Sequence, residues 1–288
     1  MDIVRTIKLE TLVEQAKEGS EVALESLVRQ IQAQVYNLAL RMLWQPADAE
    51  DAAQEILIKI ITHLSQFRGE SSFTTWVYRV ASNHLLTTRK RRSELRELTF
   101  EQLGNKLDLG IQLTTTNSEE RVEQQILIDE TLMSCTLAML LCLDREHRLA
   151  YLLSEAFEVS GEEGAYIMDV TPAAFRKRLS RARLRMREFM GSKCGLVNPA
   201  APCHCSQQVH AKIKFDKLSL ETVQFADPTK HLTPNFSAAT LEERVLELKQ
   251  LDRAAGVFRS HPKYAAPEKF IEAVQKLLNS GQYKLLEN

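Results

Sequence analysis

Long apolar runs and an export signal are both missing from this sequence of 288 residues. No stretch reaches the roughly eighteen consecutive apolar residues that a membrane-spanning helix needs. The first ten residues also lack the basic segment followed by an apolar segment that directs secretion. We therefore expect a protein that remains in the cytoplasm and does not insert into a membrane.

The sequence has few cysteines, in an odd number, and it has no glycine-rich loop. Five cysteines fit poorly with the paired disulfides of a secreted domain, which leaves reduced thiols or a metal site. No glycine-rich loop for phosphate is present, and no general base accompanies the cysteines and histidines. The sequence thus predicts a protein that is not an enzyme and requires no cofactor.

A net charge of -1 hides two strongly basic segments. Five basic residues fall within eight positions from Arg89 to Arg96, and seven basic residues with no acid lie between Arg176 and Arg187. Such blocks within a neutral total indicate a protein that contacts both DNA and another protein. A pair of solvated helix faces is the alternative, so the surrounding sequence must decide.

Apolar residues recur at intervals of three and four in the first part of the chain, which predicts amphipathic helices. The first helix ends at Pro46, the second begins near Ala47, and Ser71 or Ser72 can cap the third. The predicted buried stripes are Leu24, Leu27, Ile31, Val35, Leu38 and Met42; Ala53, Ile56, Leu57, Ile60, Ile61 and Leu64; and Phe73, Trp76, Val77, Val80 and His84. We therefore predict an all-α fold.

The pattern resumes after an interruption. Residues 94–120 lose the periodicity, so they are interpreted as a linker with one helical turn. Periodicity returns over residues 126–153, and a short helix covers 161–168. Thr171 and Pro172 suit the start of a further helix, because Thr caps free amides and Pro is tolerated at the first helical position.

Acidic residues gather at the head of the second predicted helix. Asp48, Asp51 and Glu55 share one face at positions i, i+3 and i+7, with Glu50 and Gln54 beside them. This acidic strip is either a docking face for a basic partner or a solvated helix start favoured by the helix dipole.

Aromatic, hydroxyl and basic side chains alternate from Phe67 to Asn83, just before the first basic run. Single-stranded nucleic acid needs such a mixture, because bases stack on rings while cations follow the phosphates. The alternative is a plain hydrophobic core, which we accept for Phe73 and Val80. Trp76, Tyr78 and Asn83 stay open to either interpretation.

Residues 160–183 have the layout of a helix-turn-helix. A short helix is followed by a tight turn at residues 169–171 and then by a basic helix. This geometry places the second helix in a major groove, where Arg reads guanine and other cations hold phosphates.

Two blocks of this chain resemble a known family. The block from Leu40 to Glu55, followed by the block from Phe67 to Arg79, resembles region two of extracytoplasmic-function (ECF) sigma factors of bacterial RNA polymerase. The helix-turn-helix, which ends in Arg178-Leu-Ser-Arg-Ala-Arg183, is similar to their region four. The resemblance covers roughly residues 15–190.

The resemblance implies a division into four parts: region two at 15–95, a linker at 96–122, region four at 123–190, and a C-terminal extension at 191–288. It implies that core RNA polymerase is bound by Asp48, Glu50, Asp51, Gln54 and Glu55. It implies that the minus-ten promoter element is recognised and opened, with a base flipped into a pocket, by Arg68, Ser72, Thr75, Trp76, Tyr78, Arg79, Asn83, Arg89, Lys90, Arg91 and Arg92. It implies that the minus-thirty-five element is read by Thr171, Ala173, Ala174, Arg176, Lys177, Arg178, Arg181 and Arg183.

Three positions depart from the family pattern. Gly164 stands where a bulky aliphatic residue is usual, and Gly161 where an aromatic residue is common. Each glycine is expected to loosen its helix by roughly 1 kcal/mol relative to alanine. Asp169 replaces the usual turn glycine, and Asp tolerates the left-handed conformation.

The C-terminal extension contains a turn-rich segment with Cys194, Cys203, His204 and Cys205. These side chains are candidate ligands for zinc or copper, although the spacing is not that of a zinc finger and a proline-rich turn is the alternative. Cys135 and Cys142 are expected in the core.

Two apolar stripes in the extension, at 241–258 and 270–277, need partners. They pack either on each other, as a small domain, or on the sigma regions, where they would mask the basic helix.

The sequence therefore predicts a sigma factor whose partners are core RNA polymerase and promoter DNA, with an anti-sigma factor as a further candidate. The alternative is a stand-alone helix-turn-helix regulator that dimerises through its C-terminal extension. A metalloenzyme is remote, since no general base accompanies the candidate ligands.

Overall fold

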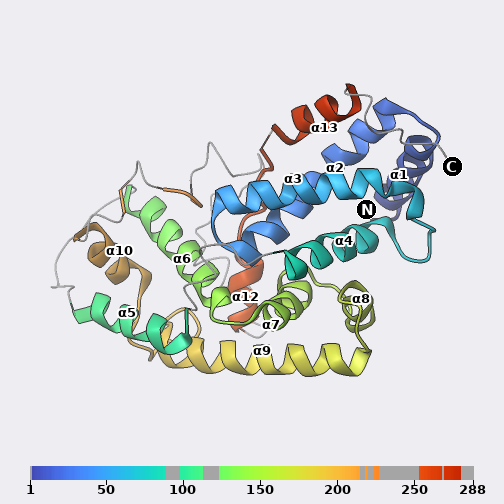
Figure 1. Cartoon of the computed structure of the whole chain (residues 1–288). Helices are drawn as coiled ribbons and strands as arrows, with labels where there is room; N and C mark the ends of the chain where they lie inside the picture. The colour runs from blue at the N-terminus through green and yellow to red at the C-terminus, as the bar shows by residue number, and fades with distance from the viewer. Residues whose placement is uncertain are drawn as a thin grey trace.

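The computed structural model describes residues 2–88, 98–112, 123–214, 218–219, 223–226, 253–267 and 269–279. All the regular elements in these ranges are helical, so the predicted all-α fold is confirmed (Figure 1). None of the helices in these ranges is long and apolar enough to cross a membrane.

The first part of the chain forms four α-helices and one turn of 3-10 helix. These are α1 (Asp2–Lys17), α2 (Glu21–Leu43), α3 (Pro46–Thr62), η1 (Leu64–Gln66) and α4 (Phe73–Thr87). Ser20 and Ser72 cap α2 and α4 by accepting hydrogen bonds from the amides of Ala23 and Thr75. The stripes predicted for α2 and α3 are fully buried, so the periodicity identified this core correctly.

Helix α5 (Phe100–Gln112) lies within the predicted linker, so the interpretation as a linker with one helical turn was wrong over these residues. Leu103 and Leu107 are buried, Phe100 packs on Phe189 with ring centroids 5.0 Å apart, and Asp108 forms an ion pair with Lys193 at 2.6 Å. The helix is thus stabilised by its contacts with other helices. Its apolar residues Phe100, Leu103 and Leu107 recur at helical spacing, which was the signal in the sequence.

The region-four part runs from α6 to α9. It contains α6 (Glu123–Leu141), α7 (Arg145–Tyr151), the π-helical turn η3 (Leu152–Ala156), α8 (Gly161–Ile167) and α9 (Pro172–Lys193). Helices α8 and α9 confirm the predicted helix-turn-helix. The predicted stripe of Phe175, Leu179, Ala182 and Met186 is buried.

The extension contributes α10 (Cys205–Lys214), α12 (Arg253–Ser260) and α13 (Lys269–Asn279). Helix α10 packs on α5 and α6, α12 on η3 and α9, and α13 on α2 and α3 (Figure 1). Of the first predicted stripe, residues 241–251 lie outside the described residues. The described helices of the extension therefore pack on the two sigma regions.

A buried arginine ties the two sigma regions together. The Arg148 guanidinium is 3% exposed and donates hydrogen bonds to the carbonyl oxygens of Met42, Leu140 and Leu143. Met42 lies at the end of α2, whereas the other two carbonyls belong to region four. This network fixes α2 against the α6–α7 corner.

Candidate nucleic-acid and polymerase interface

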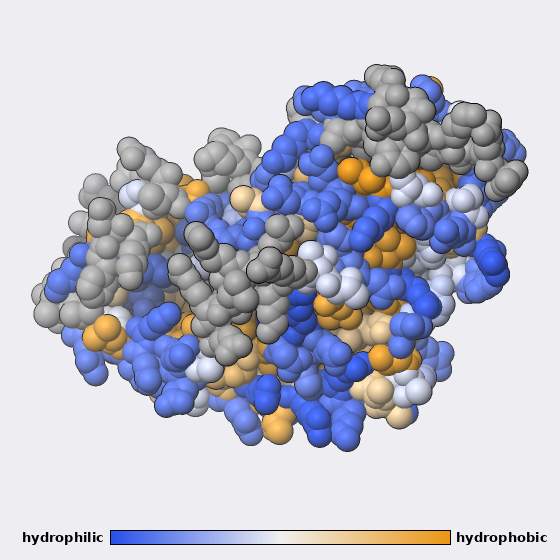
Figure 2. All heavy atoms as spheres, in the orientation of Figure 1, coloured by the Kyte–Doolittle hydropathy of each residue, from blue (hydrophilic) through white to orange (hydrophobic). Residues whose placement is uncertain are grey.

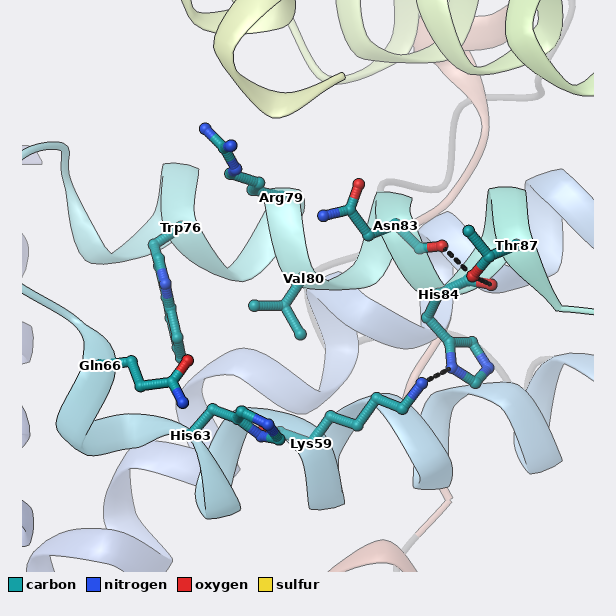
Figure 3. A pocket seen from close by; sticks show the side chains of 9 residues that line it. All are labelled: Lys59, His63, Gln66, Trp76, Arg79, Val80, Asn83, His84 and Thr87. Carbon is teal, nitrogen blue, oxygen red and sulfur yellow. Dashed lines mark hydrogen bonds between the residues drawn. The ribbon is translucent and has the colours of Figure 1, made fainter. Parts of the chain in front are cut away.

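A hollow of about 290 Å³ lies between α4 and the end of α3. Trp76, Val80 and His84 project from α4 toward α3, and His84 Nδ1 lies 2.9 Å from Lys59 Nζ (Figure 3). Asn83 and Arg79 extend from α4 away from α3 (Figure 3). The hollow is thus walled by an indole ring, amides and cations, which is the mixture that binds a nucleic-acid base and its phosphate.

The hollow includes residues that the sequence analysis missed: Lys59, His63, Gln66, His84 and Thr87. His84 had been assigned only to the core, and it is indeed 3% exposed. A histidine within an apolar stripe was the signal available, because a buried imidazole requires polar partners.

Trp76 belongs to an aromatic cluster at the base of the hollow. Its ring stacks on Phe73 and tilts against Phe67, with both centroid distances at 5.6 Å. These contacts fix the indole while leaving it half-exposed. Trp76 therefore packs on the core and also lines the hollow, and its contact with nucleic acid stays a prediction.

Thr75 and Tyr78 are not accessible in this arrangement, contrary to their predicted place on the minus-ten surface. Thr75 is 6% exposed, and its hydroxyl donates to Glu163 Oε1 at 3.3 Å. Tyr78 is 9% exposed, with its ring centroid 5.4 Å from that of Phe157. Both are covered by region four. Arg68, Ser72 and Asn83 are exposed as expected, whereas Arg89, Lys90, Arg91 and Arg92 lie outside the described residues.

Arg79 joins α4 directly to the helix-turn-helix. Its guanidinium forms an ion pair with Asp169 at 2.8 Å and lies 4.4 Å from the ring centroid of Tyr166. With the contacts of Thr75 and Tyr78, this interaction packs α4 against α8. One predicted minus-ten residue is therefore engaged within the protein.

The turn of the helix-turn-helix is well determined by its sequence. Asp169 adopts a φ of 54°, which confirms the expected left-handed conformation. Thr171 accepts a hydrogen bond from the Ala174 amide at 3.2 Å, and Pro172 occupies the first turn of α9. Ser160 and Glu163 form a capping box at the start of α8.

The packing of α8 on α9 requires glycine at position 164. A Cβ atom at this position would lie 2.3 Å from Phe175 Cζ, so the bare backbone of α8 admits the ring from α9. At Gly161, by contrast, a Cβ atom would meet no atom within 4 Å. The expected loosening is therefore wrong for Gly164, where glycine allows the two helices to approach.

The basic helix α9 presents an exposed polar face (Figure 2). Of its predicted DNA-binding residues, Thr171, Ala173, Arg176, Lys177, Arg181 and Arg183 are exposed, and Ala174 and Arg178 are half-buried. Arg178 forms an ion pair with Glu146 at 2.8 Å, and Arg183 Nε donates to Glu155 Oε1 at 2.6 Å. Two of the predicted cations thus hold α9 in place. Helix α12 of the extension contacts α9, while Arg176, Lys177 and Arg181 remain exposed, so masking of the basic helix by the extension stays a prediction.

The acidic strip lies on the outer side of α3. Asp51 and Glu55 are exposed, whereas Asp48, Glu50 and Gln54 are half-buried. Glu55 Oε2 lies 3.4 Å from His84 Nε2, and Glu50 forms an ion pair with Lys269 of α13. The extension therefore occupies one end of the predicted docking face.

The cysteine-rich turn is compact, and its backbone is paired between Cys194 and Cys203. Burial raises the pKa of the Cys203 thiol to about 11 and those of Cys135 and Cys142 to about 12, which keeps these thiols protonated at neutral pH. The described residues offer no group of three or more His, Cys, Asp or Glu side chains placed to hold a metal ion. Zinc or copper binding stays a prediction from the sequence, without support from this geometry.

Both blocks of the chain match known families. Residues 27–94 match Sigma-70 region 2, and residues 133–186 match Sigma-70 region 4. The ECF RNA polymerase sigma-E factors of Escherichia coli K12 and Salmonella typhimurium LT2 are each 31% identical over 177 residues, which cover 60% of this chain and 90% of theirs. The Haemophilus influenzae sigma-E factor is 31% identical over 181 residues, with the same coverage.

A solved structure of the sigma factor RpoE with the anti-sigma factor NepR from Bartonella quintana is also similar. It shares 19% identity and covers 57% of this chain and 93% of its own, with a TM-score of 0.37 that is too low for residue-by-residue comparison. The matches in sequence are sufficient by themselves: this chain belongs to the ECF family of RNA polymerase sigma factors.

Proposed function

We propose that this chain is a non-catalytic initiation factor that binds core RNA polymerase in the cytoplasm and directs it to promoters. One observation carries the proposal: the two sigma regions occur in order, and 31% identity to sigma-E factors spans 90% of their length. A stand-alone helix-turn-helix regulator would need only the second region, so the presence of region two favours the sigma factor.

The minus-ten element is assigned to α4 and its hollow. Trp76 offers a fixed ring for stacking, while Lys59 and Asn83 place a cation and an amide at the same hollow. A single flipped base fits this chemistry, because an unpaired base is bound by stacking together with hydrogen bonds to its edge. The hollow has a volume of about 290 Å³, close to the smallest volumes usual for ligand sites, which are roughly 300 Å³.

The minus-thirty-five element is assigned to α9. Arg176, Lys177 and Arg181 are exposed on the helix that follows the Thr171 cap. Arg pairs in bidentate fashion with guanine in the major groove, whereas the remaining cations neutralise phosphates. Arg178 and Arg183 support this helix from within through their acidic partners.

Binding of core polymerase is assigned to the acidic strip on α3. Asp51 is its best-placed carboxylate, because it is exposed on α3, whereas Glu50 and Glu55 have partners in Lys269 and His84. Docking onto a basic surface would be electrostatically favourable and would weaken with added salt.

The test uses full-length protein, purified core polymerase and a promoter library for run-off transcription. We expect Asp51→Lys to weaken co-purification with core polymerase, with Glu101→Lys as a control because Glu101 is an exposed acid on α5, outside the strip. Thermal unfolding shows whether both variants fold. Unchanged co-purification of folded Asp51→Lys contradicts the strip assignment, while absence of promoter-directed transcription by the parent protein contradicts the proposed function itself.

A further inference from the structure

A second cavity, of about 460 Å³, lies where α1, α2, α4, the end of η3 and the segment after α12 meet. Its walls include Asn37 and Arg41 of α2, Phe157 and Glu158 after η3, and His261 and Lys263 after α12. The volume falls within the range of roughly 300–1,000 Å³ that is usual for small-molecule sites. Thr74 and Tyr78 of α4 also line it, but it shares no lining residue with the hollow between α3 and α4.

Arg41 is a buried cation on this wall. The residue is 5% exposed, and its Nη1 donates to Asn37 Oδ1 at 3.3 Å. Its guanidinium lies over the rings of Phe157 and Tyr264, at 5.3 Å and 6.0 Å, while its Nε has no hydrogen-bond partner within the described ranges. Burial lowers the pKa of Arg41, and the groups that oppose this effect are two phenols rather than a carboxylate. Burying a cation without a carboxylate partner costs free energy, so an anion bound beside Arg41 would stabilise this site.

His261 supplies an acceptor on the same wall. It is 4% exposed, and its Nε2 lies 2.7 Å from the Thr136 hydroxyl. Because that hydroxyl donates to the Leu132 carbonyl at 2.8 Å, the imidazole Nε2–H is the donor and Nδ1 keeps its lone pair. Nδ1 has no hydrogen-bond partner in the described part of the chain. Burial, and then Arg41, lower the pKa of His261 to about 3, so the ring is neutral at physiological pH.

The other charges around the cavity leave it positive. Arg259 lines it and is paired with Glu155 at 3.4 Å and Glu158 at 3.6 Å. Lys263 adds an exposed ammonium at the rim. Glu158 is the acid on the described wall, and it faces Arg259.

We propose that this cavity binds a small organic anion, either a carboxylate or a phosphate ester, that also carries a hydroxyl or amino group. The anionic end pairs with Arg41 and Lys263 at the cavity wall. His261 Nδ1 is covered in this arrangement, so the O–H or N–H group donates to it after a local side-chain movement. Charge-assisted hydrogen bonds of this kind are stronger than neutral ones, and the low exposure of Arg41 strengthens them further.

Because α2, the end of η3 and the segment after α12 all form the wall, the ligand stabilises the arrangement in which they meet. That arrangement covers Thr75 and Tyr78 of α4. The ligand therefore opposes promoter opening, a consequence that rests on the proposed function, whereas binding itself does not.

The experiment measures thermal unfolding of the full chain with citrate or with glycerol 3-phosphate, against sodium chloride at equal ionic strength. A ligand that binds only the folded state raises Tm, and we expect roughly 5 °C or more near saturation for at least one probe. Citrate tests the carboxylate class, and glycerol 3-phosphate tests the phosphate-ester class.

Arg41→Gln should abolish the Tm increase, and Lys263→Ala, at an exposed position, should reduce it without affecting the fold. Arg176→Ala with Arg181→Ala is the matched control, because it removes exposed cations far from the cavity wall and should keep the full increase. If Arg41→Gln fails to fold, Lys263→Ala decides. No Tm increase with either probe, or an increase that survives Lys263→Ala unchanged, overturns the proposal.

Discussion

The two helices assigned to DNA, α4 and α9, differ in their surroundings. Helix α9 presents Arg176, Lys177 and Arg181 to solvent, whereas Thr75 and Tyr78 of α4 are buried beneath region four. The predicted minus-thirty-five face is therefore open in this arrangement, while the predicted minus-ten face is covered at these two residues and exposed at Arg68, Ser72 and Asn83. Double-stranded DNA could be engaged first, and opening of α4 would require the two regions to separate.

The largest effect is expected from the open helix. Replacing Arg176 and Arg181 with alanine should cost about 1–3 kcal/mol for each base that is no longer hydrogen-bonded. This is roughly 5- to 150-fold per base in affinity for minus-thirty-five DNA. Fluorescence anisotropy over a salt series measures this, and a smaller number of phosphate contacts also flattens the salt slope.

Arg178→Ala is the comparison for this experiment. Because Arg178 is paired with Glu146, we expect its removal to lower the free energy of unfolding slightly and to affect DNA less than the double substitution does. An equal decrease in affinity would show that exposure does not separate the base-reading cations from the supporting ones.

A smaller effect is expected from uncovering α4. Phe157→Ala removes the ring that packs on Tyr78 and lies beside Arg41. An aromatic pair contributes about 0.5–1.5 kcal/mol beyond its buried area, so the closed arrangement should be destabilised by about that amount. Affinity for single-stranded minus-ten DNA should rise up to roughly tenfold, because less of the binding energy is then needed to separate the regions.

Phe100→Ala is the matched control for Phe157→Ala. Phe100 is also half-buried and packs on a ring, that of Phe189, but away from α4. An equal rise in affinity for both variants would mean that general loosening, rather than uncovering of α4, is being measured.

The smallest effect is expected from the ion pair between the regions. Asp169→Asn removes the charge that faces Arg79 but keeps a residue that tolerates the φ of 54°. Exposed ion pairs contribute about 0–1 kcal/mol, so affinity for minus-ten DNA should rise less than about fivefold, and only at low salt. A rise that persists at high salt would contradict this electrostatic explanation.

The sequence was sufficient to predict the helices within each sigma region, but it did not predict how the two regions pack against each other. Periodicity identified Leu24 through Met42 as buried, because apolar spacing reports which side of a helix faces its own domain. It could not report that Phe157 covers the opposite side of α4, since that contact joins residues distant along the chain. For the same reason Tyr78 was assigned to DNA.

The errors at α5 and Gly164 have a related cause. Leu103 and Leu107 have helical spacing, but their packing partners are known only when Phe189 and α10 are placed, and Gly164 becomes informative only when the Phe175 ring is placed. Helix propensity predicts that glycine destabilises a helix. Where two helices approach closely, however, only glycine leaves room for the neighbouring side chain.

The extension is attached to region two partly through its main chain. The Asn37 side chain donates to the Tyr264 carbonyl at 2.7 Å and accepts from the Tyr264 amide at 3.0 Å. The Asn37 side chain thus makes the donor and acceptor pair of hydrogen bonds that a neighbouring β-strand would make with the main chain of Tyr264. These two bonds do not depend on the side chain at residue 264, whereas Asn37→Ala removes both of them. The Tyr264 ring is fully buried, and its hydroxyl donates to Met133 Sδ of α6 at 3.1 Å. Helix α2 thus holds the main chain of the extension at this point, while region four holds the side chain of the same residue.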